Sequence, residues 1–565
     1  MAPHDKPLIE VHQLTLHYEE AKSPTLNGID FCLSHGETAL LLGPSGSGKS
    51  TLTYCLNGLY PGELDGSMNG KRYYQGVPFE NFEAGELSQR VGVVFQDPES
   101  QFCMLTVEDE IAFGLENLKT APEIIREKVD RALEMVGLMD VKEAEISTLS
   151  GGMKQKLALA CVLAMEPELL ILDEPTSLLD PHARRSFIET VVKLQEENDF
   201  ALLIIEHNLD EWLPYGDRCL LINSRGEIFY DGSIAQGFYQ HYEAIKSEGI
   251  WVPELFRTAQ ELSDQGLIEL GGEYPVRLES LAGNIPETLE YKPAELLSET
   301  KYIDSSRETH LSLQNIGYKH ILGDITTEIK EGEWAAIIGA NGAGKTTLSL
   351  LMAGLLHSST GNIQLNNKAM ADYREHLLWQ EIGYVFQNPE YQFVADTVFE
   401  EVAFGLRLQE IPEKVLTEKT NHLLDRYGLL THADRHPYTL SQGQKRRLSI
   451  ATMMVEHQSL LILDEPTFGQ DERAAAEIID LLEARNQAGT TLVMVTHDME
   501  LVEQHADHVI VVDKGKVAFE GSPSELWQKN NHWLEQHHLQ KPFRVRLEEA
   551  ARKREGNYEF TGTQS

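Results

Sequence analysis

GPSGSGKST (Gly43–Thr51) and GANGAGKTT (Gly339–Thr347) are two copies of one glycine-rich motif. Each copy follows a short apolar run, ETALLLG in the first case and WAAIIG in the second, and precedes a stretch of helical composition. The apolar runs predict buried strands, and the order of strand, glycine-rich turn and helix is the one that a phosphate-binding loop requires. Glycines let the backbone approach closely, amides point at the phosphates, and a helix N-terminus favours anions. We therefore predict two phosphate-binding loops, with a purely structural turn as the alternative.

Within each loop, the lysine and the hydroxyl residue after it have specific expected roles. Lys49 and Lys345 should bridge the β- and γ-phosphates of a nucleotide, whereas Ser50 and Thr346 should ligate Mg²⁺. The loop residues expected to contact the nucleotide are Gly43, Ser45, Gly46, Gly48, Lys49, Ser50 and Thr51 in the first copy and Gly339, Asn341, Gly342, Gly344, Lys345, Thr346 and Thr347 in the second.

The two loops belong to a repeat that runs through most of the chain. Three further motifs recur in the same order, namely VFQDPESQF (Val94–Phe102) as VFQNPEYQF (Val385–Phe393), LSGGMKQ (Leu149–Gln155) as LSQGQKR (Leu440–Arg446), and LLILDEPT (Leu169–Thr176) as LLILDEPT (Leu460–Thr467). The loop lysines are 296 residues apart, whereas the glutamines and the glutamates of the other motifs are 291 residues apart. This constancy indicates one domain duplicated whole, with length changes mostly between the first two motifs.

LLILDEPT has four apolar residues followed by two acids, the pattern of a buried strand that presents carboxylates at its C-terminal edge. Asp173 and Asp464 should hold Mg²⁺ directly or through water, and Glu174 and Glu465 should orient and polarise the attacking water. The alternative is that each acid caps a following helix, but the phosphate-binding loop in the same repeat favours the catalytic role.

Together, the phosphate-binding loop, the glutamine-containing segment, the LSGGQ-like signature and the LDEP motif resemble the ABC ATPase family, and the resemblance covers nearly all of both repeats. It implies that the nucleotide is ATP and that the chain hydrolyses it. In that family the signature begins a helix that caps the γ-phosphate of a nucleotide held by the other domain. The resemblance therefore implies that the two domains pair head to tail and share both sites.

By this resemblance, Ser150, Gly151 and Gly152 should complete the site built on Lys345. Likewise, Ser441 and Gly443 should complete the site built on Lys49, although Gln442 stands where a glycine is usual. Because the serine and the later glycine would make the phosphate contacts, we expect this site to work, with altered affinity. An ordinary capped helix is the alternative for either signature.

Further positions match the family's pattern in pairs. His207 and His497 follow apolar strands and resemble the switch histidine, Asp180 and Asp471 resemble the loop that communicates across the dimer, Tyr18 and Tyr318 stand where an aromatic stacks on adenine, and Gln96 and Gln387 begin the loops that sense the nucleotide and its Mg²⁺. For the tyrosines, simple packing against a strand is the alternative.

The residues after these glutamines, QDPESQFCMLTVEDEIAFGLEN and QNPEYQFVADTVFEEVAFGLR, resemble the energy-coupling-factor (ECF) ATPases of prokaryotic vitamin and metal importers. The resemblance implies two membrane partners, a transmembrane coupling protein and a small substrate-capturing protein, and peripheral attachment at the cytoplasmic face. The fused arrangement most resembles ECF ATPases assigned to thiamine or its pyrimidine precursor. The acids that follow the glutamine loops, Glu108, Asp109, Glu110, Glu400 and Glu401, should either face basic coupling helices or cap and solubilise an exposed helix.

Two rival functions are open from the sequence. One is a tandem ABC protein acting on the ribosome, and the other is a fused sugar-importer ATPase, in which one site is commonly degenerate. The formal net charge of −41, from 89 acidic and 48 basic side chains, disfavours nucleic-acid binding. The first residues, MAPHDKPLIE, lack a secretory signal pattern and no apolar run of spanning length occurs, so we expect a soluble chain without membrane insertion. The five cysteines occur singly and are expected to be buried free thiols in a reducing cytoplasm.

The predicted organisation follows from the repeat. We expect nucleotide-binding domains at residues 1–235 and 306–530, an acidic connector at 236–305 and a polar tail at 531–565 that is frayed after about residue 540. Residues 241–300 carry 12 acids against 4 basic residues, and ELFRTAQELSDQGL should be an amphipathic helix within an otherwise extended tether. Each domain should be α/β, with a mainly parallel sheet around the phosphate-loop helix, an antiparallel β subdomain and a helical subdomain.

Overall fold

The apolar run before each glycine-rich loop forms a fully buried strand, β3 (Thr38–Leu42) in the first repeat and β13 (Trp334–Ile338) in the second. The computed structural model describes residues 6–559, except residues 20, 84, 178, 208, 271–273, 286–306, 409–410 and 455–457. It divides into two compact units, residues 1–290 with 549–565 and residues 291–548. Each unit contains one copy of every repeated motif.

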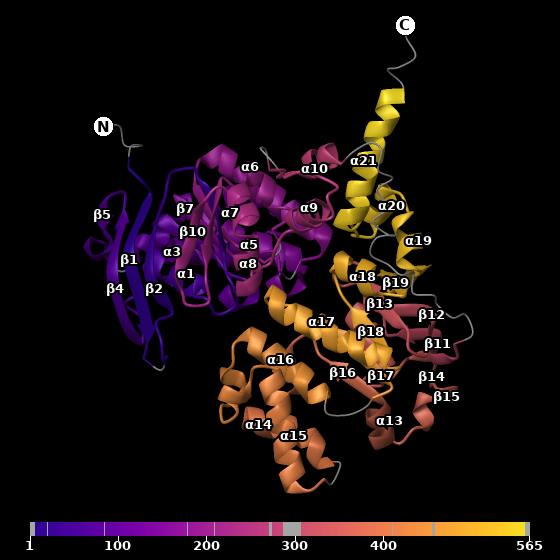
Figure 1. Cartoon of the computed structure of the whole chain (residues 1–565). Coiled ribbons are helices and arrows are strands. Elements are labelled where there is room, and N and C mark those ends of the chain that lie inside the picture. The colour runs from indigo at the N-terminus through magenta and orange to yellow at the C-terminus, as the bar shows by residue number, and fades with distance from the viewer. Residues whose placement is uncertain are drawn as a thin grey trace. The chain divides into compact units, whose positions relative to one another are not determined.

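The first unit contains two sheets and their helices (Figure 1). Its elements are β1 (Ile9–Tyr18), β2 (Leu26–Leu33), β3, α1 (Lys49–Leu56), β4 (Gly66–Tyr74), β5 (Val77–Pro78), α2 (Glu86–Arg90), β6 (Val91–Val94), η3 (Pro98–Gln101), α3 (Val107–Asn117), α4 (Pro122–Val136), α5 (Gly151–Leu163), β7 (Leu169–Asp173), α6 (Pro181–Asn198), β8 (Ala201–Ile205), β9 (Arg218–Ile222), β10 (Ile228–Gly232), α7 (Ile234–Gln240), α8 (Tyr242–Glu248), α9 (Glu254–Asp264) and α10 (Leu278–Asn284).

The second unit follows this order, except that a helix, α18 (Met499–His505), precedes the strand that corresponds to β9. Its elements are β11 (Thr309–Tyr318), β12 (Leu322–Lys330), β13, α12 (Lys345–Met352), β14 (Thr360–Leu365), β15 (Lys368–Ala369), α13 (Glu375–Glu381), β16 (Ile382–Val385), η8 (Pro389–Gln392), α14 (Val398–Leu408), α15 (Glu413–Arg426), α16 (Gln442–Met453), β17 (Leu460–Asp464), α17 (Glu472–Gln487), β18 (Thr491–Val495), α18 (Met499–His505), β19 (His508–Asp513), β20 (Lys516–Gly521), α19 (Pro523–Trp527), α20 (Asn531–Gln536) and α21 (Phe543–Glu559), the last of which continues past residue 548.

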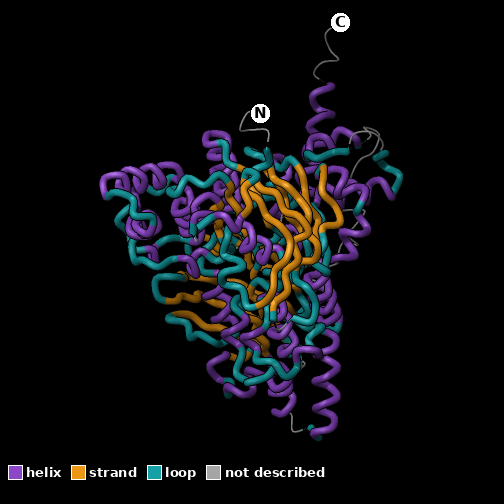
Figure 2. Tube along the Cα trace, turned by 90° about the vertical axis from the view of Figure 1, so that its left-hand side faces the viewer, coloured by secondary structure: helices purple, strands orange, loops and turns teal. Residues whose placement is uncertain are grey.

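A six-stranded sheet forms the centre of each unit, in the order β10-β9-β3-β8-β7-β6 and β20-β19-β13-β18-β17-β16. All neighbours are parallel except the edge strands β10 and β20, which are antiparallel to β9 and β19. Strands β3, β7 and β8 are buried along their whole length, as expected for a parallel sheet that is covered on both faces. Figure 2 shows strands running side by side with helices along their flanks.

One face of each central sheet packs against a four-stranded antiparallel sheet, β2-β1-β4-β5 in the first unit and β12-β11-β14-β15 in the second. The phosphate-loop helices α1 and α12 contribute Leu52 and Leu348 to these cores. In the second unit the other face is covered by apolar side chains of α14, α16 and α17. The predicted fold class, two tandem α/β domains with an antiparallel and a helical subdomain, is therefore confirmed.

Part of the connector packs on a domain, as the sequence predicts. The predicted amphipathic helix is present as α9, and it is preceded by α7 and α8. Phe238 of α7 stacks on Phe256 of α9 with ring centroids 4.6 Å apart, and both rings are fully buried. The ring of His241, whose centroid lies 4.8 Å from that of Tyr230 of β10, attaches this segment to the first unit, while residues 286–306 of the predicted tether lie outside the described part of the chain.

Two expectations drawn from composition need correction. Part of the predicted polar tail is helical, because Leu534 and Leu539 complete an apolar cluster with Val509 and Val511 of β19. A few hydrophobic residues spaced along this polar segment are enough to pack it against β19. The five cysteines are free thiols as expected, but Cys32 and Cys103 are exposed rather than buried.

Candidate nucleotide-binding sites

The two glycine-rich loops curve around their lysines. Lys49 Nζ donates hydrogen bonds to the carbonyl oxygens of Gly43 and Pro44, at 2.7 and 2.9 Å. Lys345 Nζ donates to Gly339 and Ala340 in the same way, with both distances 2.9 Å. Each ammonium group is therefore held inside its loop at the N-terminus of a helix, where partial positive charge already favours an anion.

The last glycine of each loop has a backbone conformation that other residues rarely adopt. Gly48 has φ 95° and Gly344 has φ 103°. A Cβ atom at Gly48 would lie 2.8 Å from the carbonyl oxygen of Thr25, and one at Gly344 would lie 2.6 Å from Leu322. The turn into the helix can therefore be made only by glycine at these positions.

In the first unit, five predicted residues meet at the C-terminal edge of the central sheet. Asp173 ends β7 and its carboxylate interacts with the Ser50 hydroxyl at the start of α1. Glu174 accepts a hydrogen bond from Gln96 Nε2 at 2.8 Å, and its other carboxylate oxygen lies 3.0 Å from His207 Nε2. The tertiary structure thus brings together residues that are up to 157 positions apart in the sequence.

These neighbours act in opposite directions on the two carboxylates. Burial raises the pKa of Asp173 to about 6, although the hydrogen bond from Ser50 opposes this shift. Burial also raises the pKa of Glu174, but the proximity of His207 and Lys49 lowers it more, so the net shift is downward. Glu174 is therefore held as the anion that a water-orienting residue needs.

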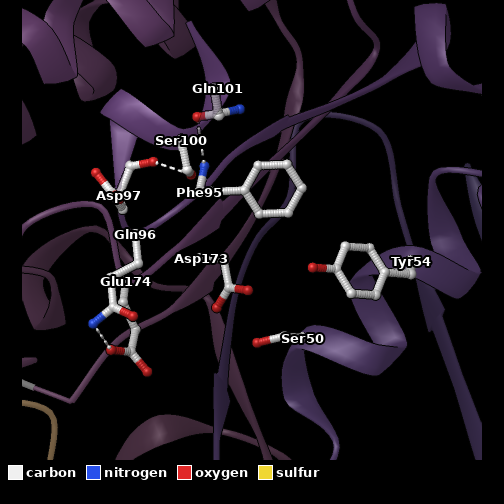
Figure 3. A pocket seen from close by; sticks show the side chains of 9 residues that line it. All are labelled: Ser50, Tyr54, Phe95, Gln96, Asp97, Ser100, Gln101, Asp173 and Glu174. Atoms are coloured by element: carbon white, nitrogen blue, oxygen red, sulfur yellow. Dashed lines mark hydrogen bonds between the residues drawn. The ribbon is translucent and has the colours of Figure 1, made fainter. Parts of the chain in front are cut away.

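A pocket of about 580 Å³ opens at this cluster (Figure 3). Its walls are Ser50, Tyr54, Phe95, Gln96, Asp97, Ser100, Gln101, Asp173 and Glu174. In Figure 3 the Asp173 carboxylate and the Ser50 hydroxyl face each other, and the rings of Tyr54 and Phe95 lie across the pocket from Gln96 and Glu174. The carboxylate and hydroxyl oxygens are the donor types that Mg²⁺ prefers.

The second unit has the corresponding residues, and one contact is shared while those of the glutamate differ. Thr346 Oγ1 donates to Asp464 Oδ2 at 2.8 Å, which matches Ser50 and Asp173. His497 Nε2 lies 3.6 Å from Glu465 Oε1, and that oxygen accepts no hydrogen bond from the described residues. Burial, followed by the neighbouring Asp464, raises the pKa of Glu465 above its ordinary value. Gln387 is exposed, whereas Gln96 is partly buried against Glu174.

Both candidate catalytic glutamates have left-handed backbone conformations. The φ angle is 51° at Glu174 and 52° at Glu465, and neither residue is glycine. Each is fixed from the neighbouring strand, because its amide donates to a carbonyl oxygen of Ile205 or Val495. Such strain persists only where the surroundings impose it, and it is found mainly at functional sites.

The signature serines are exposed N-caps. Ser150 caps α5 by accepting from the Met153 amide, and Ser441 caps α16 in a capping box with Gln444. Gln442, the departure from the usual glycine, is exposed in the first turn of α16 and leaves this cap intact. Gly151, Gly152 and Gly443 lie in the first turns of the same two helices.

Asp180 and Asp471 are also N-caps. Their carboxylates accept from the amides of Ala183 and Ala474, each at 2.9 Å, at the starts of α6 and α17. The structure therefore assigns them a role within their own units, and any role across a domain interface is additional to it.

The two predicted adenine-stacking tyrosines are partly buried at the ends of β1 and β11. The Tyr18 hydroxyl lies 3.1 Å from Thr51 Oγ1 and 3.2 Å from the Tyr60 hydroxyl, which places the ring beside the phosphate-loop helix. Lys319 Nζ lies 5.0 Å from the centre of the Tyr318 ring. Both rings keep partial exposure, as a stacking platform requires.

The acids after the glutamine loops fall into two groups. Glu110 and Glu401 are buried, and each uses Oε2 to accept two loop amides, those of Cys103 and Met104 or of Val394 and Ala395. They hold the loops and cannot face a basic partner, which corrects that interpretation. The remaining three stay at the surface, where Glu108 pairs with Lys142, Asp109 with the Thr106 cap, and Glu400 with Arg407.

Sequence reasoning missed Arg446. This guanidinium is only 2% exposed and donates to the carbonyl oxygens of Phe386 and Gln387. Burial lowers its pKa to about 10, against the opposing effect of Glu465 and Asp464. The available signal was the change from Gln155 in the first signature to Arg446 in the second.

Comparison with known proteins decides the family. Residues 26–177 and 322–468 each match the family model described as ABC transporter. The chain belongs to the ABC transporter family. It is thus an ABC ATPase with two ATP-binding domains, and the repeated motifs are the two copies of one ABC domain. The resemblance inferred from the sequence motifs is confirmed.

Two relatives of this ABC ATPase span nearly its whole length. It is 44% identical over 536 residues to YkoD of Bacillus subtilis (strain 168), named as an HMP/thiamine import ATP-binding protein, and 95% of each chain is covered. An ABC transporter ATP-binding protein of Methanosarcina acetivorans is 36% identical over 534 residues, which cover 92% of this chain and 87% of the relative. Among solved structures, cbiO1 of Clostridium perfringens, titled as part of the ABC transporter complex cbiONQ, is 30% identical with a TM-score of 0.39 and covers 45% of this chain and 100% of that one.

Proposed function

We propose that this ABC ATPase is the energising subunit of an ECF-type importer, in which it drives a transmembrane coupling protein that works with a small substrate-capturing membrane protein. The observation that carries the proposal is the 44% identity, over 95% of both chains, to a protein named for HMP/thiamine import. The cargo belongs to the class of vitamins, vitamin precursors or transition metals, and this likeness favours thiamine or HMP.

The residues of each site support hydrolysis by positioning and charge. Lys49 and Lys345 bind the β- and γ-phosphates from inside their loops, and Mg²⁺ would supply further neutralisation of phosphate charge. Ser50, Asp173 and Gln96 would hold the metal in the first repeat, and Thr346, Asp464 and Gln387 would hold it in the second. Glu174 and Glu465 orient the attacking water, while His207 and His497 contact the γ-phosphate.

We further propose that the two domains share their sites head to tail. The exposure of the Ser150 and Ser441 caps supports this arrangement, because an N-cap hydroxyl and the free amides behind it form a ready anion site. Ser150, Gly151 and Gly152 then complete the Lys345 site, and Ser441 and Gly443 complete the Lys49 site.

Attachment to the membrane would be through the partner. No helix among the described residues has the length and hydropathy needed to cross a bilayer. Exposed apolar side chains beside the second glutamine loop, Tyr391 at 77%, Val394 at 72% and Phe404 at 51%, support docking of a partner there. We place the chain peripherally on the cytoplasmic face of the cell membrane.

Coexpression with and without the coupling and capture proteins of the same transport system tests this function. We expect the chain in the membrane fraction only with the coupling protein present, and uptake of radiolabelled thiamine or HMP only with all components and with Glu174 and Glu465 intact. Tight binding to protein-free lipid vesicles, or sedimentation with ribosomes that persists at moderate salt, would contradict the importer.

A further inference from the structure

The two repeats differ where the signature helix meets the glutamine loop. In the second repeat, Arg446 of α16 donates from its two terminal nitrogens to the carbonyl oxygens of Phe386 and Gln387, both at 2.5 Å. These are the residues at which the chain leaves β16 and enters the glutamine loop. The loop is thus bonded to the helix at the sensing glutamine itself.

A second set of bonds joins the same two segments. Gln392 Nε2 donates to the carbonyl oxygen of Ser449 at 2.9 Å and to Thr452 Oγ1, and the Ser449 hydroxyl donates back to Gln392 Oε1 at 2.8 Å. Arg446, Ser449 and Thr452 are spaced three residues apart on α16, so they share one face of the helix. We call these three residues, together with Gln392, the loop clamp.

The first repeat lacks the three α16 clamp residues. Gln155, Ala158 and Cys161 stand at the three positions on α5, and only Gln155 reaches the loop, by one long bond of 3.4 Å to the Phe95 carbonyl oxygen. Gln101, the counterpart of Gln392, turns instead to its own loop, where it accepts from the Phe95 amide at 3.2 Å (Figure 3).

One ion pair between the glutamine loop and the signature helix is present in both repeats. It therefore does not contribute to the difference in how strongly the two loops are bonded to their helices. Lys154 pairs with Glu99, and Lys445 pairs with Glu390, each at 2.5 Å. The clamp adds to this pair a buried guanidinium that satisfies two carbonyl groups. Hydrogen bonds from a charged donor are stronger than neutral ones, and breaking them would leave a buried charge without partners. The second glutamine loop is therefore tied to α16 more strongly than the first is tied to α5.

We propose that the loop clamp couples the two ATP sites of this chain. Under the shared-site arrangement proposed above, on which this inference rests, α16 presents Ser441 to the nucleotide at Lys49, while Gln387 senses the nucleotide at Lys345. A clamp between Gln387 and α16 then links occupancy of one site to the capping group of the other. The corresponding route through Gln96 and α5 lacks a clamp and transmits less.

Coupling between binding sites is reciprocal, so the clamp raises the affinity of each site when the other is filled by the same factor. Substitutions of the clamp residues in α16 should therefore reduce the coupling in both directions, whereas substitution of the matched position in α5 should have little effect.

Hydrogen exchange on the full-length chain tests whether the clamp holds the second glutamine loop more firmly than the first loop is held. Peptides covering residues 386–394 should exchange at least about fivefold more slowly than peptides covering residues 95–103. Replacing the clamp by the first-repeat residues, Arg446→Gln with Ser449→Ala and Thr452→Cys, should remove this difference. The reverse exchange, Gln155→Arg with Ala158→Ser and Cys161→Thr, should slow the first loop, because Gln101 can supply the fourth member.

Binding of MgATP tests the coupling. In a chain carrying Glu174→Gln and Glu465→Gln to prevent hydrolysis, the affinity of the Lys49 site is measured with the second site intact and with Lys345→Ala. We expect the ratio of the two affinities to be about fivefold or more. Gln392→Leu, which removes the bonds of Gln392 from the loop side and leaves the two Arg446 bonds in place, should lower the ratio. Combined with Arg446→Gln it should bring the ratio close to one, and Arg446→Lys should lower the ratio less than Arg446→Gln. Gln155→Ala is the matched control and should leave the ratio unchanged.

An unchanged affinity ratio in the chain that combines Gln392→Leu with Arg446→Gln, or equal hydrogen exchange of the two loops in the unmodified chain, would overturn the clamp. Neither result would affect the importer function, because membrane attachment and uptake are measured separately. Conversely, a chain that never assembles with a coupling protein but loses its affinity ratio in the clamp variants would overturn the importer and keep the clamp.

Discussion

Glu174 and Glu465 stand in identical octapeptides and have the same left-handed backbone, but their side chains have different surroundings. Gln96 and His207 bond to Glu174, whereas Glu465 is buried beside Asp464 with a longer approach to His497. The pKa of the first is lowered and that of the second is raised. Local sequence determines the backbone here, and the tertiary neighbours determine the charge state.

At the residue scale, we predict that Glu174→Gln combined with Glu465→Gln keeps MgATP binding and lowers hydrolysis by orders of magnitude. The amide has nearly the shape of the carboxylate but cannot orient and polarise water as the anion does. ATPase assays and nucleotide-binding titrations of the same preparation give the comparison. Substantial turnover by the double variant would remove both residues from this role.

The buried Glu401 carries a second prediction at this scale. Glu401→Ala should lower the free energy of unfolding by about 1–3 kcal/mol, because the amides of Val394 and Ala395 lose their acceptor. Glu401→Gln keeps an acceptor oxygen and should retain much of the stability. Denaturant unfolding checks this, with Glu400→Ala as the control, since the exposed pair with Arg407 contributes at most about 1 kcal/mol. Equal losses for Glu400→Ala and Glu401→Ala would contradict the assignment.

At the scale of elements, different ion pairs join the antiparallel edge strand to its neighbour in the two central sheets. In the first unit Arg218 of β9 lies 2.7 Å from Glu37 and 2.8 Å from Asp231 of β10. In the second unit His508 of β19 takes this position, 3.7 Å from Glu333 and 3.2 Å from Glu520 of β20. An arginine is charged at every relevant pH, but a histidine is not.

The second unit should therefore lose stability in mild alkali. The nearby carboxylates of Glu333 and Glu520 favour the protonated imidazole, outweigh the opposite effect of burial and raise the pKa of His508 to about 9. Because the folded pKa lies above the unfolded value of about 6.5, the stabilisation is complete below pH ~6.5 and is lost as the pH rises through 9. We expect a loss on the order of 2 kcal/mol between pH 7 and 9.5.

Thermal unfolding at pH 7 and pH 9.5 measures this loss, and the difference between variants isolates the histidine from other titrating groups. His508→Arg, which copies the first unit, should flatten the pH dependence. Arg218→His should introduce the same dependence into the first unit. Parallel pH profiles for the unmodified chain and His508→Arg would exclude His508 as the source.

Helices outside the repeated motifs show how far sequence patterns reach at this scale. The apolar spacing within Glu254–Leu267 was enough to predict α9, because one face had to be buried. The helices after residue 530 were missed, since their overall composition is polar. A few apolar residues there, among them Leu534 and Leu539, pack against apolar side chains of β19. Local sequence patterns do not predict this long-range contact.

At the scale of the whole molecule, the testable consequence is the pairing of the repeats. Ser150→Arg should place a bulky cation at the γ-phosphate of the nucleotide held by Lys345 and leave the contacts of the Lys49 site intact. Its effect on the ATPase rate of the assembled transporter should therefore resemble that of Lys345→Ala. The double variant should lose little more than either single one, because both changes damage one site.

The control combines Ser150→Arg with substitution of the other loop lysine, Lys49. Ser150→Arg with Lys49→Ala damages both sites and should cost more than either change alone. Full additivity of Ser150→Arg with Lys345→Ala, together with none between Ser150→Arg and Lys49→Ala, would mean that each repeat completes its own site. Ser441→Arg should give the reciprocal pattern.

By itself, the sequence determined the duplication, the two phosphate-binding loops, the acids at the ends of β7 and β17 and the family, because each is written in contiguous residues whose local geometry is forced by glycine, buried strands and helix N-termini. Only the tertiary structure decided which side chains surround each glutamate, that Glu110 and Glu401 hold loops, and that Arg446 makes two bonds to the second glutamine loop where Gln155 makes one long bond to the first. These features depend on residues distant in the sequence meeting in a buried environment. Burial and the distance to partner groups determine the charge state of each side chain and the strength of its hydrogen bonds. A sequence pattern contains neither quantity.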